Sequence, residues 1–208
     1  MKSVVVTGGT KRLGACIAET LEAEGWRVLR TSHRPDPLAD IIEDLTQADA
    51  PASLMDKAMM LLGGKMPDAL INNAALFSLG DDDVSSLNYI APKILTELMS
   101  QRSDIGAVVN ILDSRILHCS PVTPYEKSKA DLRDFTLRSA AQYAGILRIN
   151  AVATGPVLAP EKVHEAAGAT PFGRPSPTDV ANAVSFLLSA TATTGCIVAV
   201  DGGQSVQM

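Results

Sequence analysis

VVVTGGTKRLG, residues 4–14, joins a short apolar run to a glycine-rich turn, and helical periodicity follows from residue 13 to residue 24. A glycine turn between a strand and a helix lets the backbone approach a pyrophosphate, to which the helix N-terminus offers free N–H groups and a partial positive charge. The stretch therefore predicts a nucleotide site at the end of the first strand, with Gly8 and Gly14 as its central positions. Taken alone, these glycines are also compatible with an ordinary strand-to-helix turn.

Outward from this turn, short apolar runs alternate with helix-like segments along the chain. Runs typical of strands buried on both faces are 4–6, 27–31, 41–45, 69–72, 107–112, 147–152 and 197–200. Helical periodicity marks residues 13–24, 54–62, 87–99, 125–143 and 179–189. This alternation predicts an α/β chain with a doubly wound Rossmann fold, a parallel seven-stranded sheet, and a single NAD(P)-binding domain over residues 1–208. Only residues 35–40 separate the second run from the third, so we expect the crossover helix there to be missing or reduced to a loop.

Composition excludes several classes of partner. The 208 residues are 46% apolar and 20% charged, and no apolar run approaches the roughly 18 to 20 residues that a membrane span needs. A net charge of −5 disfavours a nucleic-acid partner, because phosphate binding draws on clustered Lys and Arg. Cys16, Cys119 and Cys196 lie far apart, as do the three histidines, so we predict no metal site. Residues 1–9 pass straight into the first strand and its turn, which favours a cytoplasmic protein.

The end of the second apolar run bears on which dinucleotide is bound. The chain reads Thr31-Ser32-His33-Arg34, with no acid until Asp36. An acid here would accept hydrogen bonds from a ribose 2′-hydroxyl, whereas basic groups accommodate a 2′-phosphate. Arg12 in the glycine turn adds a second guanidinium, which matches phosphate geometry. We therefore predict NADPH as the cofactor, with solvation of both arginines at the surface as the alternative.

Tyr125 and Lys129 form the candidate chemical centre. If a helix begins near Tyr125, the two side chains lie one turn apart on the same face. A nearby ammonium lowers the pKa of a phenol from about 10 toward neutrality, where the phenol can donate or accept a proton. Tyrosine and lysine four residues apart are common by chance, so the pair gains weight only from other motifs in the chain.

Five motifs occur along the chain in a recognisable order. After the glycine turn come Asn72-Asn73-Ala74-Ala75, Tyr125-x-x-x-Lys129, RINAVA at residues 148–153 and VDGG at residues 200–203. Together they resemble the short-chain dehydrogenase/reductase family over essentially the whole chain. The resemblance implies that Tyr125 protonates the substrate, that Lys129 holds the nicotinamide ribose, and that Asn88 completes a proton relay.

The same resemblance implies a set of cofactor contacts and an assembly. The expected cofactor-binding residues are Gly8, Thr10, Arg12, Leu13, Gly14, His33, Arg34, Asp44, Leu45, Asn73, Ala74, Lys129, Gly155 and Pro156. The family implies a homo-oligomer, a tetramer or a dimer, and a substrate lid over residues 158–170.

Asp113 is the main departure from the family pattern. It stands where the family usually carries a serine that donates a hydrogen bond to the substrate carbonyl. An ionised carboxylate only accepts hydrogen bonds, so Asp113 suits a substrate that presents N–H groups or takes a proton on a ring nitrogen. If the strand end bulged by one residue, Ser114 could take the usual serine role instead. Both alternatives stay open at this stage.

Several departures are similar to one branch of the family, the pteridine and dihydromonapterin reductases. These are Lys11-Arg12-Leu13-Gly14, His33-Arg34, Asp113, and Phe77, which lies four places after Asn73. The resemblance implies an NADPH-dependent reductase that transfers hydride to a dihydropterin-type ring. The expected catalytic residues are Asp113, Tyr125, Lys129 and Asn88, and the expected substrate contacts are Phe77, Asp113, Ser114 and Tyr125.

Two other functions remain compatible with these residues. One is a general short-chain carbonyl or 3-oxoacyl reductase, in which Ser114 or a water polarises the substrate carbonyl. The other is a nucleotide-binding regulator that kept the fold and lost turnover. Tyr125, Lys129 and Asn88 are all present, which argues against the regulator.

Overall fold

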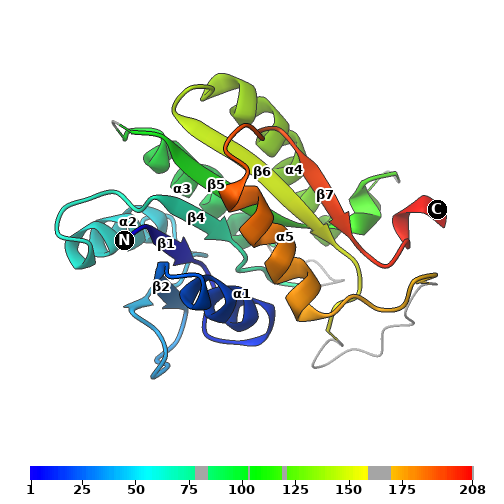
Figure 1. Cartoon of the computed structure of the whole chain (residues 1–208), viewed down its shortest axis with the longest axis horizontal. Helices are drawn as coiled ribbons and strands as arrows, with labels where there is room; N and C mark the ends of the chain where they lie inside the picture. Colours follow the sequence, from blue (N-terminus) through cyan, green and yellow to red (C-terminus); the bar gives the residue numbers. More distant parts are fainter. Residues whose placement is uncertain (78–83, 103, 119–120, 159–169, 208) are drawn as a thin grey trace.

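The computed structural model of the chain describes residues 1–77, 84–102, 104–118, 121–158 and 170–207. Within them, one parallel seven-stranded sheet has the strand order β3-β2-β1-β4-β5-β6-β7 (Figure 1). The strands are β1 (Ser3–Val6), β2 (Arg27–Ser32), β3 (Ile41–Ile42), β4 (Ala69–Asn72), β5 (Gly106–Asp113), β6 (Leu147–Thr154) and β7 (Ile197–Val200). The predicted doubly wound fold and its seven strands are confirmed.

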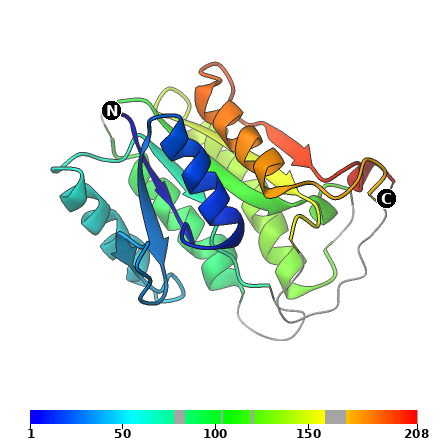
Figure 2. The same ribbon diagram turned by 60° about the horizontal axis from the view of Figure 1, so that its bottom comes forward.

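Helices cover both faces of the sheet. They are α1 (Arg12–Ala23), α2 (Ala50–Leu61), α3 (Ala91–Met99), α4 (Pro124–Gln142) and α5 (Pro177–Ser189). Figures 1 and 2 show α1 and α5 together on one face, and α2, α3 and α4 lie on the other. No helix in the part of the chain that the structure describes is long and apolar enough to cross a membrane.

The first strand shows why the sheet is apolar on both faces. Val4 and Val6 pack into the core under α1 and α5, while Val5 packs into the core under α2 and α3. All three are fully buried. Successive side chains of a strand point to opposite faces, so a strand covered on both sides has no polar positions to alternate with.

The strand order places a ligand site at the centre of the sheet. From β1 the chain runs outward to β2 and β3, then returns to pair β4 with the other side of β1. The strand order therefore reverses between β1 and β4, and the connections on the two sides of this point run away from each other. In open α/β sheets, ligands bind in the resulting crevice outside the carboxyl ends of the strands.

The connection from β2 to β3 lacks a helix, as the sequence predicted. The third strand, predicted over residues 41–45, is shorter and covers only Ile41–Ile42. The reason is local: the Asp44 carboxylate accepts hydrogen bonds from the backbone N–H of Thr46, at 3.1 Å, and from its hydroxyl, at 2.8 Å. An aspartate that bonds two residues ahead in this way makes a turn and ends the strand.

The predicted helix over residues 87–99 is in fact two elements. A π-helical turn, Ser86–Ile90, precedes α3, and the N–H of Ala91 bonds to the carbonyl of Ser86 five residues back. Pro92 has no N–H to donate to the carbonyl of Asn88, four residues earlier, so regular α-helical bonding cannot run through this point. The apolar periodicity predicted the helix but not this change in its pitch.

Candidate active site

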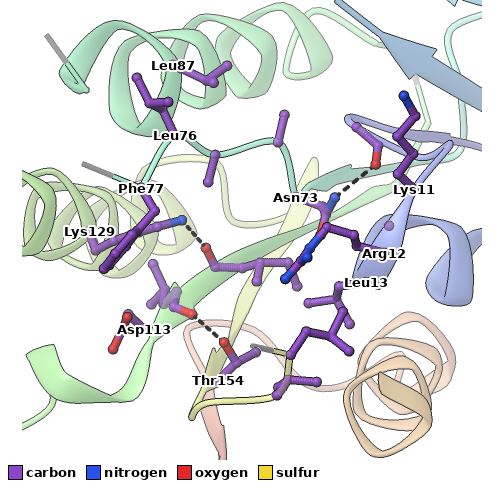
Figure 3. Close-up of a pocket in the computed structure, with 18 of the residues that line it drawn as sticks. Lys11, Arg12, Leu13, Asn73, Leu76, Phe77, Leu87, Asp113, Lys129 and Thr154 are labelled. Carbon is purple, nitrogen blue, oxygen red and sulfur yellow. Dashed lines mark hydrogen bonds between the residues drawn. The ribbon is translucent and has the colours of Figure 1, made fainter. Parts of the chain in front are cut away.

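A cleft of about 750 Å³ opens at the carboxyl ends of the strands. Figure 3 shows Lys11, Arg12 and Leu13 on one side of it and Phe77, Asp113 and Lys129 on the other. Sixteen of the predicted site residues line it: Gly8, Thr10, Arg12, Leu13, Gly14, His33, Asp44, Leu45, Asn73, Ala74, Phe77, Asp113, Tyr125, Lys129, Gly155 and Pro156. Arg34, Asn88 and Ser114 are not among the lining residues. Most of the expected lid, residues 159–169, lies outside the described residues, as does Cys119.

The glycine turn disfavours side chains at both of its central positions, at Gly8 through its backbone conformation and at Gly14 through close packing. Gly8 has a φ of +62°, in the left-handed region that favours glycine. A Cβ added at Gly14 would lie 2.0 Å from the carbonyl oxygen of Gly8. Any side chain at Gly14 would therefore push the turn apart.

The start of α1 differs from the starts of α4 and α5. Neither a side-chain cap nor an acid in the first turn is present at the N-terminus of α1. In contrast, α4 and α5 begin with complete capping boxes, Thr123 with Glu126 and Ser176 with Asp179. A capping box satisfies the first N–H groups of a helix with its own side chains. The start of α1 has no such side-chain cap and adjoins the closely packed glycine turn on the cleft, so this end of the cleft fits the pyrophosphate of a dinucleotide.

Asn73 ties the end of β4 to the glycine turn (Figure 3). Its side-chain amide donates to the carbonyl oxygens of Thr7, at 2.9 Å, and Gly8, at 3.3 Å. Its backbone N–H donates to the hydroxyl of Thr7 at 2.9 Å. These bonds hold the ends of β1 and β4 together beside the glycine turn.

The region beyond the turn mixes acidic and basic groups. Hydrogen bonds from Thr46 lower the pKa of the Asp44 carboxyl, and the electrostatic effects of His33 and Arg34 act in the same direction. Lys11 pairs with Asp36, with a Nζ to Oδ2 distance of 3.5 Å. The guanidinium of Arg34 is close enough to act on Asp44, although Arg34 does not itself line the cleft.

Arg12 has an unusual backbone conformation. It is the one non-glycine residue with positive φ in the described part of the chain, at 53°. For an L-residue this conformation costs on the order of 1–2 kcal/mol. Its side chain lines the cleft beside the start of α1, and residues held in such conformations cluster at functional sites.

The start of α4 fixes Tyr125 and Lys129. Thr123 caps this helix by accepting the N–H of Glu126 at 3.1 Å, and Pro124 occupies its first turn. Lys129 Nζ donates to the carbonyl oxygen of Ile111 at 2.9 Å and lies 6.0 Å from the centre of the Tyr125 ring. Burial lowers the pKa of Lys129 to about 8, against an opposing effect of Asp113. The helix thus brings the two groups together as the spacing predicted.

Asp113 is held by four hydrogen bonds. Its Oδ1 accepts the backbone N–H of Arg115 at 2.9 Å and the Nε of Arg115 at 3.0 Å. Its Oδ2 accepts Nη2 of Arg115 at 2.7 Å and the hydroxyl of Tyr125 at 3.2 Å. A carboxylate has about four lone-pair positions, so these bonds fill it.

Ser114 points away from the cleft. Its side chain is fully buried and absent from the cleft lining, whereas Asp113 both lines the cleft and keeps its register opposite Thr154 at the end of the β5–β6 ladder. The strand end therefore does not bulge. Of the two alternatives left open by the sequence, the geometry brings Asp113 to the cleft.

Arg115 is a site residue that the sequence reasoning missed. Its Cζ lies 5.7 Å from the centre of the Phe77 ring and 5.6 Å from that of Tyr125, and these rings are 4.8 Å apart at an angle of 73°. Hydrogen bonds to Asp113 raise the pKa of Arg115, so the guanidinium stays protonated. An aspartate at a strand end commonly turns back to the N–H two residues on, and this signal could have pointed to Arg115.

Asn88 is fully buried behind the cleft. Its Oδ1 accepts the N–H of Leu76 at 2.8 Å, and its Nδ2 donates to the carbonyl of Leu76 at 2.9 Å and to the hydroxyl of Ser128 at 3.1 Å. Leu76 precedes Phe77. Asn88 therefore anchors the segment that carries the Phe77 ring.

These features define a dinucleotide-binding α/β oxidoreductase. An uncapped helix N-terminus meets a closely packed glycine turn, and a tyrosine with a buried lysine stands across the same cleft. A family model described as enoyl-(acyl carrier protein) reductase matches residues 79–205, which is more than half of the chain. The chain belongs to the short-chain dehydrogenase/reductase family and is an NAD(P)-dependent oxidoreductase, as the sequence predicted.

Individual relatives resemble the chain over nearly its full length. A 3beta-hydroxysteroid dehydrogenase 1 of Eggerthella lenta is 29% identical, over 99% of this chain and 94% of the relative. The FolM alternative dihydrofolate reductase 1 of Brucella suis, solved in complex with NADP, is 26% identical with a TM-score of 0.83, over 99% of this chain and 95% of that one. The 3-alpha-hydroxysteroid dehydrogenase of Pseudomonas sp. B-0831 shares the fold at 23% identity, with a TM-score of 0.87 over 100% and 98% of the two chains.

Proposed function

We propose that this chain is an NADPH-dependent reductase that transfers hydride to a dihydropterin-type ring. The observation that carries the proposal is the Phe77 ring on the cleft, 4.8 Å from the ring of Tyr125, at a site where the carboxylate of Asp113 stands in place of a serine hydroxyl. A flat heteroaromatic ring can stack on such a side chain, with a gain of about 1 kcal/mol beyond burial. The similarity to the FolM alternative dihydrofolate reductase of Brucella suis supports a ring of this type.

The preference for NADPH rests on the basic groups at the adenosine end. Arg12, Lys11 and His33 line this part of the cleft. Guanidinium and ammonium groups accommodate a 2′-phosphate, and no acid stands between Thr31 and Arg34 to accept a ribose hydroxyl. Two FolM structures, from Brucella suis and Brucella canis, contain NADP, which supports the same cofactor here.

The side chains divide the work of binding and proton transfer. NADPH supplies the hydride, and the glycine turn with the start of α1 would hold its pyrophosphate. Tyr125 would hold the transferred proton at its hydroxyl, which donates to Asp113 and is oriented by it. Lys129, whose Nζ lies 6.0 Å from the centre of the Tyr125 ring, would hold the nicotinamide ribose and place a positive charge beside the phenol. Asn88 would fix the Phe77 segment through Leu76.

A general carbonyl or 3-oxoacyl reductase is the second candidate. It is favoured by the description of the matching family model and by the similarity to a hydroxysteroid dehydrogenase. In this case the substrate would present a carbonyl oxygen to Tyr125 rather than a ring to Phe77. We also propose a homo-oligomer, a tetramer or a dimer, on the basis of the family.

An NADPH-oxidation screen tests the proposed function. The purified chain is assayed with dihydrobiopterin, dihydromonapterin and dihydrofolate, and in parallel with simple ketones. We expect kcat/KM for at least one dihydropterin to exceed that for the best ketone by about 100-fold or more, since a site built for ring contacts rejects analogues that lack them. Activity on ketones alone would overturn the pterin proposal and favour the second candidate. Tight NADPH binding without any turnover would favour a regulator.

A further inference from the structure

Arg115 sits where three features of the substrate end meet. It is bound to Asp113 through Nε and Nη2, and its Cζ lies within 5.7 Å of the centres of both the Phe77 and Tyr125 rings. Its side chain is 29% exposed and lines the cleft. A substrate that reaches the Tyr125 hydroxyl must therefore pass close to this guanidinium.

Asp113 and Arg115 differ in how many hydrogen bonds they can still form with a substrate. Asp113 already accepts four hydrogen bonds, so a substrate N–H could bind it only by displacing Arg115 or Tyr125. A guanidinium has five N–H groups, of which Asp113 takes two. The distance from Nη1 of Arg115 to Oε1 of Glu126 is 4.0 Å, beyond hydrogen-bond length, and no other acceptor among the described residues bonds Nη1. Arg115 is thus the member of the pair with donors to spare.

The guanidinium is also held in place. The backbone N–H of Arg115 is bonded to Asp113 at the start of a short 3-10 turn, Ser114–Ile116, so the backbone and the side chain of Arg115 are tied to the same carboxylate. Two parallel bonds to a carboxylate fix a planar guanidinium in orientation as well as in position. Donors preorganised in this way stabilise charge that develops on a substrate oxygen.

We propose that Arg115 is the hydrogen-bond donor to an acceptor oxygen of the substrate, in place of the serine hydroxyl that the cleft lacks. Asp113 is then the positioning residue that holds Arg115. The site then favours a substrate with an oxygen acceptor within reach of the guanidinium, and the two adjoining rings favour a flat one. The inference rests on the proposed function only in requiring that the substrate bind in this cleft. It applies equally to a carbonyl oxygen on a ring and to a ketone oxygen.

Four variants separate this role from simple neutralisation of Asp113. They are Arg115→Gln, Arg115→Lys, the double variant Asp113→Asn with Arg115→Gln, and the control Arg133→Gln. Arg133 matches Arg115 closely: its side chain is 28% exposed, it pairs with a neighbouring aspartate and it bonds the same short turn, but it does not line the cleft. Each variant is assayed for kcat and KM with dihydrobiopterin and a small diketone, and for NADPH affinity.

We expect Arg115→Gln to lower kcat/KM by about 100-fold, as removal of one preorganised donor does elsewhere. NADPH affinity should stay at the wild-type value. The kcat/KM of Arg115→Lys should lie between those of the wild type and Arg115→Gln, because an ammonium keeps the charge but not the planar geometry of the guanidinium. The double variant should stay as slow as Arg115→Gln. If it regained wild-type turnover, Arg115 would only neutralise Asp113 and the inference would fail, as it would if Arg133→Gln were equally slow.

A binding measurement keeps this test separate from that of the proposed function. If the diketone alone is turned over, the pterin proposal fails, but the same variants still decide the role of Arg115. If neither substrate is turned over, the protein with NADP⁺ is titrated with benzoate, an aromatic ring that carries anionic oxygens. We expect Arg115→Gln and the double variant to weaken benzoate binding by about tenfold, equivalent to about 1.4 kcal/mol, relative to Arg133→Gln. Equal binding by all of these proteins would overturn the inference.

Discussion

Arg12 combines a strained backbone with a side chain on the cofactor cleft. Glycine would adopt the same φ of 53° without strain. We therefore expect Arg12→Gly to leave the free energy of unfolding unchanged or to raise it by up to about 1 kcal/mol, the relief of strain less the extra entropy that glycine loses. NADPH affinity should fall about tenfold while NADH affinity stays the same, because a charge-assisted bond to the 2′-phosphate is lost.

Fluorescence titration of both cofactors and thermal unfolding measure these two effects. Arg27→Gln is the matched control, since Arg27 carries the same charge but bonds the carbonyl of Leu61 at an exposed site. An unchanged ratio of NADPH to NADH affinity in Arg12→Gly would show that Arg12 does not bind the 2′-phosphate.

Lys129 gives the reduction a pH dependence of known sign. Its pKa in the folded chain is about 8, because burial disfavours the ammonium. We expect kcat/KM to fall as the pH is raised through about 8, where the ammonium that tunes Tyr125 is lost. The guanidinium introduced by Lys129→Arg stays protonated, so whatever activity this variant retains should not fall in this range.

Stability should respond to the same titration in the opposite direction. The folded-state pKa of Lys129, about 8, lies below the ordinary lysine value of 10.5, so between these values the unfolded chain binds more protons. The contribution of this group to the free energy of unfolding therefore rises with pH over that interval. Loss of activity together with loss of structure above about pH 8 would contradict the assignment of the activity change to Lys129.

Local spacing predicted some of these side chains and missed others for a physical reason. Tyr125 and Lys129 were found because a helix fixes which residues share a face. Arg115 was missed because its position depends on how the chain turns after β5, which the apolar pattern of the strand does not encode. The choice between Asp113 and Ser114 likewise needed the register of β5 against β6.

At the scale of elements, the π-helical turn before α3 brings Asn88 to both backbone polar groups of Leu76. We expect Asn88→Ala to lower the free energy of unfolding by about 2 kcal/mol, since it leaves buried polar groups unpaired. It should also raise KM for the substrate, because the Phe77 segment loses its anchor, with NADPH affinity little changed. Steady-state kinetics and denaturant unfolding measure both.

Asn110 provides the control for this anchor. It is equally buried and bonds Asn72 and Thr136, away from the Phe77 segment. Asn110→Ala should lower stability by a similar amount without the rise in KM. If both variants raised KM alike, the effect of Asn88 would be one of general stability.

The elements show where sequence patterns reach their limit. Short apolar runs without polar alternation located all seven strands, because burial on two faces leaves no polar positions, and period-3.6 signals located the helices between them. They overestimated β3, where an aspartate turn ends the ladder, and they joined the π-helical turn to α3, where Pro92 interrupts the bonding. Both errors come from backbone hydrogen bonds, which apolar periodicity does not report.

For the whole molecule, the outer edge of the sheet at β7 has exposed apolar side chains near it. β7 ends the strand order and its residues are half-exposed, while Phe172, Phe186 and Val206 are 88%, 56% and 77% exposed. Figure 1 shows β7, α5 and the C-terminus together at the side of the molecule away from α2. An edge strand with exposed apolar neighbours is a surface that proteins usually cover.

We therefore expect the chain to be a dimer or a tetramer that uses this edge, as light scattering after size exclusion can measure. The double variant Phe172→Ser with Val206→Asp should lower the molar mass of the particle, because it removes apolar area and places charge at the contact. Each chain should still bind NADPH, since neither residue lines the cleft. Met60→Ser, at a site 80% exposed on α2, is the control and should leave the mass unchanged. A wild-type monomer would refute the assembly, whereas an unchanged mass in the double variant would move the contact to another face, such as that of α3 and α4.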